Sequence, residues 1–430
     1  MGFADRYFEK QKDFKSHIKA EPQKDLQFVV VIPCYYENKL IYSLRSLYNC
    51  SRPKSSVEVI IVINSSLKDD DKVKEQNLKT LKDTEEWIKD HSDNKFHFNI
   101  IYIPDLPPKF AGAGLARKIG MDEAVSRFNL IQNRSGIIVS FDADSVCDNN
   151  YLSEIENHFG KYPDTDGCSI YFEHPVSGDD FPDDVYRAII LYELHLRYYI
   201  QSLRYIAFPY AYHTIGSCFA VKALTYIKQG GMNKRKAGED FYFLHKIIPL
   251  GKFIDINSTR VVPSPRPSVR VPFGTGSAIN RFLMTDGSCF MTYNPAGFEA
   301  LQEFLKIIPQ LFRAKAVDLK GKIGQLPQSI QDFLLQHNAV QKINEINNNC
   351  NNINSFSRRL LSWFNAFTVL RFLNFCSKKY SPEVNIVAAV NILMSKLELI
   401  SHEITDELEL LYLLRHHERG QQHFVLSRKY

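Results

Sequence analysis

Apolar and polar residues alternate in blocks through the first third of the chain, and these blocks predict strands separated by helices. Short apolar runs that stop at polar or turn-forming residues indicate four buried strands, at 28–32, 57–63, 98–103 and 137–141. Helix-like segments follow the first three runs, at 40–48, 70–90 and 112–128. Strands that alternate with helices of this length indicate a parallel sheet covered by helices on both faces.

Residues 150–290 are less regular, and the remainder of the chain has a mixed, helical pattern. The middle part predicts a long aromatic helix at 183–208, a short strand at 216–221, a helix opening at 238–241, a Pro-rich extended segment at 263–270 and a flexible turn at 273–276. The resulting division is a polar N-terminal arm at 1–25, an α/β domain at 26–295 and a helical C-terminal domain at 296–430.

The fourth apolar run ends in two carboxylates, Asp142 and Asp144. On a strand, residues i and i+2 point the same way, so these side chains would share one ligand. Two hard oxygen donors at a strand end suit Mg²⁺ or Mn²⁺, above all where phosphate supplies further ligands. The alternative is a polar turn after the strand, because Asp is common in turns.

Polar or glycine-containing segments follow all four predicted strands. They are Tyr35-Tyr36-Glu37, Asn64, the loop at Gly112 and the pair Asp142/Asp144. Ligands of parallel α/β sheets bind at the carboxyl ends of the strands, so we expect these segments to meet on one rim.

Composition narrows the class of protein. The 430 residues are 44% hydrophobic and 23% charged, which is typical of a globular chain with two or three domains. A formal net charge of +5 is small for this length and gives no reason to expect a nucleic-acid partner.

Location follows from cysteine usage and apolar segments. Eight cysteines are scattered without zinc-site spacing, which favours free thiols in a reducing cytoplasm. Residues 1–24 lack the apolar core of a signal peptide, and no run of 18 uninterrupted apolar residues predicts a spanning helix. We expect a cytoplasmic protein, with a peripheral position at the inner face of the membrane as an open alternative.

One C-terminal stretch bears on that alternative. Residues 358–379 form an apolar, aromatic helix pattern with basic residues at both ends. Such a helix can lie on an anionic bilayer, although Arg371 and Asn365 argue against its spanning one. A core helix of the C-terminal domain is the alternative that we favour.

Five motifs occur in one order between residues 26 and 275. They are Val31-Ile32-Pro33-Cys34-Tyr35-Tyr36-Glu37, Glu58-Val59-Ile60-Ile61-Val62, Gly112-Ala113-Gly114-Leu115-Ala116-Arg117-Lys118-Ile119-Gly120, Asp142-Ala143-Asp144, and Gly230-Gly231-Met232 with Gly238-Glu239-Asp240. The set resembles family 2 glycosyltransferases with the GT-A nucleotide-diphospho-sugar fold.

That resemblance implies a fold and an activity. The expected fold is a GT-A-type, mostly parallel α/β sheet with helices on both faces, joined to a helical C-terminal domain. The expected enzyme is a hexosyltransferase-like glycosyltransferase that depends on Mg²⁺ or Mn²⁺ and inverts the configuration at the anomeric carbon of the sugar. It would move a sugar from a nucleotide-diphosphate donor to a hydroxyl of a glycan or lipid-linked acceptor.

The chain also departs from that family. Ile63-Asn64-Ser65-Ser66 stands where relatives often have Asp-Asp-Gly-Ser, so Asn64 replaces an acid that would bind the base. A later metal-binding histidine is not evident, and His213 and His245 are expected to be structural. The Gln-x-x-Arg-Trp motif of membrane-embedded processive synthases is absent.

The resemblance, together with the charge of a diphosphate leaving group, assigns roles to the carboxylates. A metal held by Asp144, with Asp142 as a second ligand or a ribose contact, would offset the charge of the departing diphosphate. Asp240 is the candidate general base for the acceptor hydroxyl, and Glu239 is assigned to binding or orienting substrate. The structural alternative for both is that acids favour the first turn of a helix.

The remaining candidates would hold the donor. The full donor-binding set is Pro33, Tyr35, Glu37, Asn64, Arg117, Asp142, Glu239, Arg266 and Arg270. Tyr35 would stack on the base, Glu37 would bind base or ribose, and Tyr36 is expected to pack in the fold. Arg266 and Arg270 would grip the diphosphate from a mobile segment.

Each of these candidates has a structural alternative. For Tyr35 the alternative is an aromatic core residue, for Arg117 it is a surface salt bridge, and for the two later arginines it is a solvated loop.

Two other function classes stay open. A nucleotidyltransferase also uses an α/β sheet and metal-binding carboxylates, but it needs a Gly-rich basic loop after the first strand, which Cys34-Tyr35-Tyr36-Glu37 does not supply. A non-catalytic sugar-nucleotide-binding module would not need Asp144 and Asp240, and both are present.

Overall fold

The computed structural model describes residues 2–11, 14–268, 274–285 and 289–421, which form two compact units. The first unit holds the chain up to Ile189, Thr214–Arg281 and a short segment from Glu418. The second holds Ile190–His213 and Phe282–His417.

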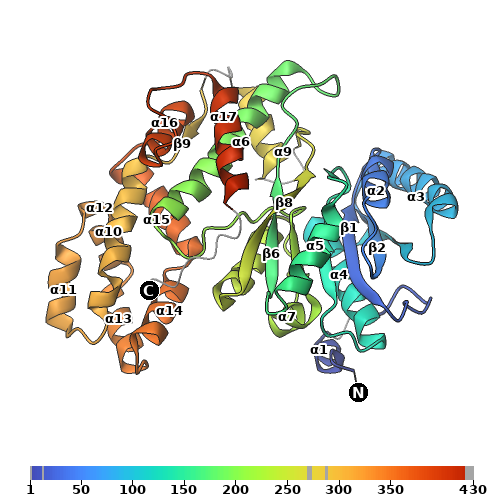
Figure 1. Cartoon of the computed structure of the whole chain (residues 1–430), viewed down its shortest axis with the longest axis horizontal. Coiled ribbons are helices and arrows are strands. Elements are labelled where there is room, and N and C mark those ends of the chain that lie inside the picture. The colour runs from blue at the N-terminus through green and yellow to red at the C-terminus, as the bar shows by residue number, and fades with distance from the viewer. Residues whose placement is uncertain (1, 12–13, 269–273, 286–288, 422–430) are drawn as a thin grey trace. The chain divides into compact units, whose positions relative to one another are not determined.

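One eight-stranded sheet is the framework of the first unit (Figure 1). Its strands are β1 (Leu26–Cys34), β2 (Ser56–Ser66), β3 (Phe96–Leu106), β4 (Ile137–Ser140), β5 (Val146–Cys147), β6 (Gly167–Phe172), β7 (Phe219–Lys222) and β8 (Phe253–Val262). Their order is β3-β2-β1-β4-β7-β6-β8-β5. Strands β3, β2, β1 and β4 run parallel, whereas β7 is antiparallel to both of its neighbours.

The four predicted strands are β1, β2, β3 and β4, which run parallel to one another. Strand β2 is buried along its whole length, and β1 is buried at all but two positions. Strands covered on both faces have to be apolar without alternation, which is why their sequences are continuous apolar runs.

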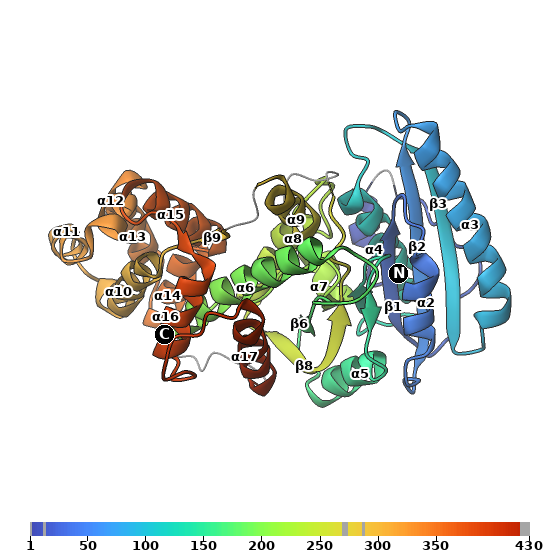
Figure 2. The ribbon, with the colours of Figure 1, turned by 90° about the horizontal axis from the view of Figure 1, so that it is seen from above.

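Helices cover both faces of this parallel part. They are α2 (Leu40–Tyr48), α3 (Asp71–His91) and α4 (Ala113–Leu130), and Figure 2 shows α4 on one side of the strands and α3 on the other. Helix α4 approaches the sheet closely, because a Cβ on Gly120 would lie 2.4 Å from a methyl group of Val31. The predicted α/β class, with a mostly parallel sheet between helices, is confirmed.

Other helices complete the first unit. They are α1 (Asp5–Lys10), α5 (Tyr151–Lys161), α7 (Ala223–Lys228), α8 (Glu239–Ile247) and the 3₁₀ turn η1 (Ile248–Leu250). Three further helices have residues in both units: α6 (Asp183–Tyr205), α9 (Thr275–Met284) and α17 (Glu407–Gly420). The predicted turn at 273–276 is wrong from Thr275 onward, since α9 begins there; residue 273 lies outside the described residues.

The second unit is helical apart from a two-stranded ribbon, as expected for the C-terminal part. Its remaining elements are β9 (Met291–Thr292), α10 (Pro295–Leu311), α11 (Ala316–Gly324), α12 (Gln328–Gln336), α13 (Ala339–Asn348), α14 (Ile353–Trp363), α15 (Ala366–Lys379), β10 (Val384–Asn385) and α16 (Ile386–Lys396). Phe333 lies 5.3 Å from Phe372 and 6.1 Å from Phe364, ring centre to ring centre. The aromatic stretch at 358–379 therefore supplies core residues of this unit.

Within the described part of the chain, no helix combines the length and the apolar character that crossing a bilayer requires.

Candidate active site

A cavity of about 530 Å³ lies at the carboxyl ends of the parallel strands, in the first unit. Eight of the predicted site residues line it: Pro33, Tyr35, Glu37, Asn64, Arg117, Asp142, Asp144 and Arg266. Sheet topology brings them together. Pro33 and Asn64 lie near the carboxyl ends of β1 and β2, Arg117 lies near the start of α4, and the other five follow strands that end on the same rim. Arg270 lies outside the described residues.

Asp142 and Asp144 flank Ala143 in a turn. Strand β4 ends at Ser140, and the N–H of Ser145 donates to the carbonyl of Asp142 at 3.2 Å. The expectation that the two acids extend a strand is thus wrong, because the backbone turns before it reaches them. Both carboxylates nevertheless face the cavity and are about one-third exposed, at 35% and 28%.

Arg117 is a buried hub and not part of a surface salt bridge, since its side chain is 3% exposed. The guanidinium donates to Asp142 at 2.9 Å and to Glu239 at 3.3 Å, and also to Ser140 and the carbonyl of Gly216. Burial would lower the pKa of Arg117, but the charges of the surrounding carboxylates raise it overall. Arg117 therefore joins the acids after β4 to the acids that begin α8.

Asp240 lies beside this hub without lining the cavity. A Cβ on Gly216 would lie 3.1 Å from Oδ2 of Asp240 and 2.9 Å from Nη2 of Arg117, so this glycine lets both side chains approach. Burial, and then the charge of Glu239, raises the pKa of the Asp240 carboxyl to about 7. A carboxyl with that pKa can accept a proton near neutral pH.

Arg266 bridges two acids on the cavity wall. Its guanidinium lies 2.7 Å from Oε2 of Glu37 and 3.1 Å from Oδ2 of Asp144. Glu37 is 3% exposed at its side chain and also accepts from the N–H of Lys39 at 2.9 Å. The cavity therefore contains a cationic group directly beside the acid predicted to bind metal.

Asn64 presents a buried acceptor at the same cavity. Its Nδ2 donates to the carbonyl of Cys34 at 3.0 Å, which orients the amide, and its Oδ1 has no hydrogen-bond partner among the described residues. An unsatisfied buried acceptor is costly, so a ligand that donates an N–H would be favoured here.

Two tyrosines after β1 differ from each other. Tyr35 lines the cavity, but Tyr36, which was expected to pack in the fold, is 41% exposed with φ of 50°. Its N–H donates to Asn77 at 2.9 Å, which holds the left-handed turn in place.

The cavity wall also contains residues that sequence reasoning missed. They include Ser66, Lys68, Asp69, Pro108, Ala111, Lys236 and Ser268. Lys68 and Lys236 lie in loops, the second at the end of the basic run Lys234-Arg235-Lys236, and no motif marks either of them; only the folded topology places them here.

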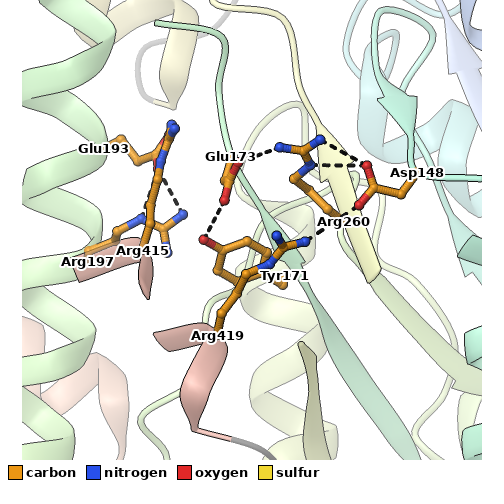
Figure 3. Close-up of polar contacts among 8 residues, drawn as sticks. All are labelled: Asp148, Tyr171, Glu173, Glu193, Arg197, Arg260, Arg415 and Arg419. Carbon is orange, nitrogen blue, oxygen red and sulfur yellow. Dashed lines mark hydrogen bonds and ion pairs between the residues drawn. The ribbon is translucent and has the colours of Figure 1, made fainter. Parts of the chain in front are cut away.

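Ion pairs fix the segment that follows the two acids (Figure 3). Arg260 of β8 donates to Asp148 at 3.0 Å and pairs with Glu173, which accepts from the hydroxyl of Tyr171 at 2.8 Å. Arg419 lies 3.6 Å from the second oxygen of Asp148. Asp148 is therefore held from two directions, just after β5.

A separate ion pair in Figure 3 belongs to the second unit. Glu193 is fully buried, and it accepts from Arg415 at 2.7 Å and from Arg197 at 2.8 Å. This arrangement ties α17 to α6 within that unit.

Among the described residues, no group of three or more His, Cys, Asp or Glu side chains is arranged to hold a metal ion. Asp142 and Asp144 supply two carboxylates, which is fewer than a protein-only site requires.

No protein-family model matches the sequence, and no curated protein matches it. Among solved structures, the chain is similar to TarS of S. aureus. TarS 1–349 in complex with UDP-GlcNAc has 15% sequence identity over 79% of this chain and 91% of that chain, with a TM-score of 0.41. TarS 1–349 in complex with UDP has 13% identity over 92% of both chains, with a TM-score of 0.37. At these values the similarity assigns neither a family nor an activity.

Proposed function

We propose that this protein is a glycosyltransferase that moves a sugar from a nucleotide-diphosphate donor to an acceptor hydroxyl. One observation carries the proposal. The cavity gathers seven residues of the predicted donor-binding set together with the predicted metal ligand Asp144, and Asp240, with a pKa of about 7, lies beside the buried hub Arg117. Donor contacts and a candidate base thus lie in one compact unit.

The walls suit the two ends of a nucleotide diphosphate. Asn64 offers an acceptor for an N–H of the base, and Tyr35 a ring on which the base stacks. Arg266 and Lys236 offer positive charge to phosphate oxygens. A cavity of this volume is in the range of small-molecule sites, about 300–1,000 Å³.

Mg²⁺ or Mn²⁺ fits the two carboxylates if protein and substrate both supply oxygen ligands to the ion. Asp142 and Asp144 are partly exposed hard oxygen donors, and a magnesium site of this kind takes its other ligands from phosphate and water. The ion would offset the negative charge that develops on the departing diphosphate. Arg266, which now contacts Asp144, would then be available to the phosphates.

Asp240 is the proposed general base. The acceptor hydroxyl would lose its proton to the carboxylate as its oxygen attacks the anomeric carbon, and the bond from that carbon to the diphosphate would break. One base and one direct displacement lead to inversion at the anomeric carbon. Arg117 acts on Asp240 by position and charge, because it lowers the pKa that burial and Glu239 raise.

The acceptor is proposed to be a glycan or a lipid-linked hydroxyl compound, and the protein is proposed to act in the cytoplasm. None of the eight cysteines forms a disulfide in the part of the chain that the structure describes, which accords with a reducing compartment. The stretch at 358–379 does not support peripheral membrane contact, because its apolar residues Leu360, Phe364 and Phe372 are buried in the second unit.

A thermal-shift screen tests donor binding. Nucleotide-diphosphate sugars, including UDP-GlcNAc, would be added with Mn²⁺ to wild type, Asp144→Ala and Asp71→Asn, the last being an exposed acid of α3 as control. We expect one donor class to raise Tm of wild type and of the control but not of Asp144→Ala, because a ligand bound to the folded state stabilises it. A panel in which no donor shifts wild type would overturn the proposal.

A further inference from the structure

Two cysteines face each other behind the acidic turn, and the glycosyl-transfer chemistry does not use them. Cys50 follows α2, and Cys147 ends β5, three residues after Asp144. Their sulfur atoms are 3.6 Å apart, although the residues are separated by 97 positions in the chain. We propose that Cys50 and Cys147 are a reversible modification site, at which a two-electron oxidant forms a disulfide that links α2 to the turn bearing Asp142 and Asp144.

The surrounding contacts hold the two thiols in place. The N–H of Ser51 donates to the carbonyl of Asn149 at 2.7 Å, and the thiol of Cys50 contacts the carbonyl of Asp148 at 3.6 Å. The ion pairs of Asp148 anchor the strand side of the pair (Figure 3). A disulfide needs a sulfur separation of about 2.0 Å, so only a small closure remains.

The two thiols are unequal in reactivity and access. Cys50 is 4% exposed, and the thiol hydrogen bond from Cys147 lowers its pKa. Cys147 is half-buried, and burial raises its pKa. The thiolate is the nucleophile, so the lowered pKa makes Cys50 the more favourable attacking thiol and leaves Cys147 to react in the second step.

The two-electron oxidant of the proposed step is a peroxide, for which hydrogen peroxide is the test reagent. The Cys50 thiolate attacks one peroxide oxygen, the O–O bond breaks, and a sulfenic acid and hydroxide form. The Cys147 sulfur then attacks the Cys50 sulfur, its proton leaves with the sulfenic oxygen as water, and the S–S bond forms. Two thiols and one peroxide give one disulfide and two waters.

Two connections would transmit the restraint of the disulfide to the acidic turn. Cys147 is in the same short segment as Asp144, and the hydroxyl of Ser43 in α2 donates to the carbonyl of Ala143 at 2.8 Å. Joining the sulfur atoms draws this segment toward α2, so the backbone of Asp142–Ser145 becomes more restrained. This consequence does not depend on the proposed function of the cavity.

Mass spectrometry of the native full-length chain tests disulfide formation. The protein would be treated with hydrogen peroxide, alkylated and digested without reduction. We expect a linked peptide pair containing Cys50 and Cys147, its loss on dithiothreitol treatment, and its absence in Cys50→Ser and Cys147→Ser. Cys289→Ser, which removes an exposed thiol, is the control and should still form the pair. Full alkylation of both cysteines after peroxide, in protein shown by circular dichroism to be folded, overturns the site.

Hydrogen exchange of the same samples tests the link to the turn. Amides from Phe141 to Asn149 should exchange more slowly in the oxidised wild type than in the reduced wild type, and Cys50→Ser should show no change with peroxide. Equal exchange in the oxidised and reduced forms would mean that the bond does not restrain the acidic turn.

Discussion

At the scale of single residues, the charge cluster around Arg117 determines what Asp240 can do. Arg117 is buried and donates to Asp142 and Glu239, while Asp240 lies close enough to affect its pKa. Three carboxylates around one guanidinium leave an excess of negative charge. Burial, and then the charge of Glu239, raises the pKa of the Asp240 carboxyl to about 7.

The transfer rate should therefore rise with pH through about 7 and level off above it, because the base must be ionised. Glu239→Gln removes the second cause of the raised pKa, so the rising limb should move to lower pH. Initial rates from pH 5.5 to 9 for wild type, Glu239→Gln and the control Asp71→Asn would check this. An unchanged limb in Glu239→Gln would contradict the assignment.

The same pKa gives a stability prediction. An acid whose pKa is raised on folding favours the folded state at low pH, and this contribution is lost as pH rises through the folded value of about 7. Asp240→Asn cannot ionise, so its free energy of unfolding should exceed that of wild type at pH 8 and approach it at pH 5. Urea unfolding at both pH values would check the direction; a variant less stable at pH 8 would refute it.

Arg266 is a second residue with a testable charge effect. Its guanidinium contacts Asp144 at 3.1 Å, so it competes with a divalent cation for that carboxylate. Arg266→Ala should bind Mn²⁺ more tightly than wild type, by about fivefold for a partly exposed pair worth roughly 1 kcal/mol. Calorimetric titration with Mn²⁺ would measure this, with Arg52→Ala as the control. Weaker binding by Arg266→Ala would show that the arginine does not compete.

At the scale of elements, continuous apolar strands that are buried on both faces of the sheet could be predicted from the sequence, and strands with polar residues in the sheet could not. Strands β1 to β4 and helices α2 to α4 were predictable because the strands are continuous apolar runs and the helices follow directly. Helix α5 and strands β6 and β8 were not predicted. Strand β8 carries polar residues inside the sheet, such as Asp255, which accepts from Ser169 of β6. Such a strand lacks an apolar signal because cross-strand partners satisfy its polar groups.

Close packing of α4 on the sheet gives a stability prediction. A Cβ on Gly120 would lie 2.4 Å from Val31 and 3.1 Å from Val62. Gly120→Ala should destabilise the protein by about 1–3 kcal/mol, the usual effect of overpacking. In α5, a Cβ on Gly160 meets nothing within 4 Å, so Gly160→Ala should be neutral or slightly stabilising. Chemical unfolding of both variants would check this, and equal stability would count against the packing.

At the scale of the whole molecule, the cavity is the point where the chain's distant segments meet. Its position and eight of its residues were predictable, because motif residues follow strands that share a rim. The loop residues Lys68 and Lys236 were not, and neither was the bridge from Arg266 to Glu37. Those contacts depend on how loops fold across the rim, which no short motif encodes.

The formal charges of the residues lining the cavity cancel. Four cationic residues, Lys68, Arg117, Lys236 and Arg266, stand against four anionic ones, Glu37, Asp69, Asp142 and Asp144. A diphosphate adds negative charge to this balanced set, so donor binding should depend on a divalent ion. Chelation with EDTA should weaken donor binding at least about tenfold in calorimetry, and added Mn²⁺ should restore it. Equal affinity with and without the metal would refute this dependence.

Release of nucleoside diphosphate during turnover tests the central claim most directly. With the donor that the thermal screen identifies, wild type and Asp71→Asn should release nucleoside diphosphate at similar rates. Asp240→Asn should still bind the donor, but its rate of nucleoside-diphosphate release should fall by at least about 100-fold, as expected for loss of a general base. Turnover by Asp240→Asn at the wild-type rate, or no release by wild type with a donor that it binds, would contradict the account.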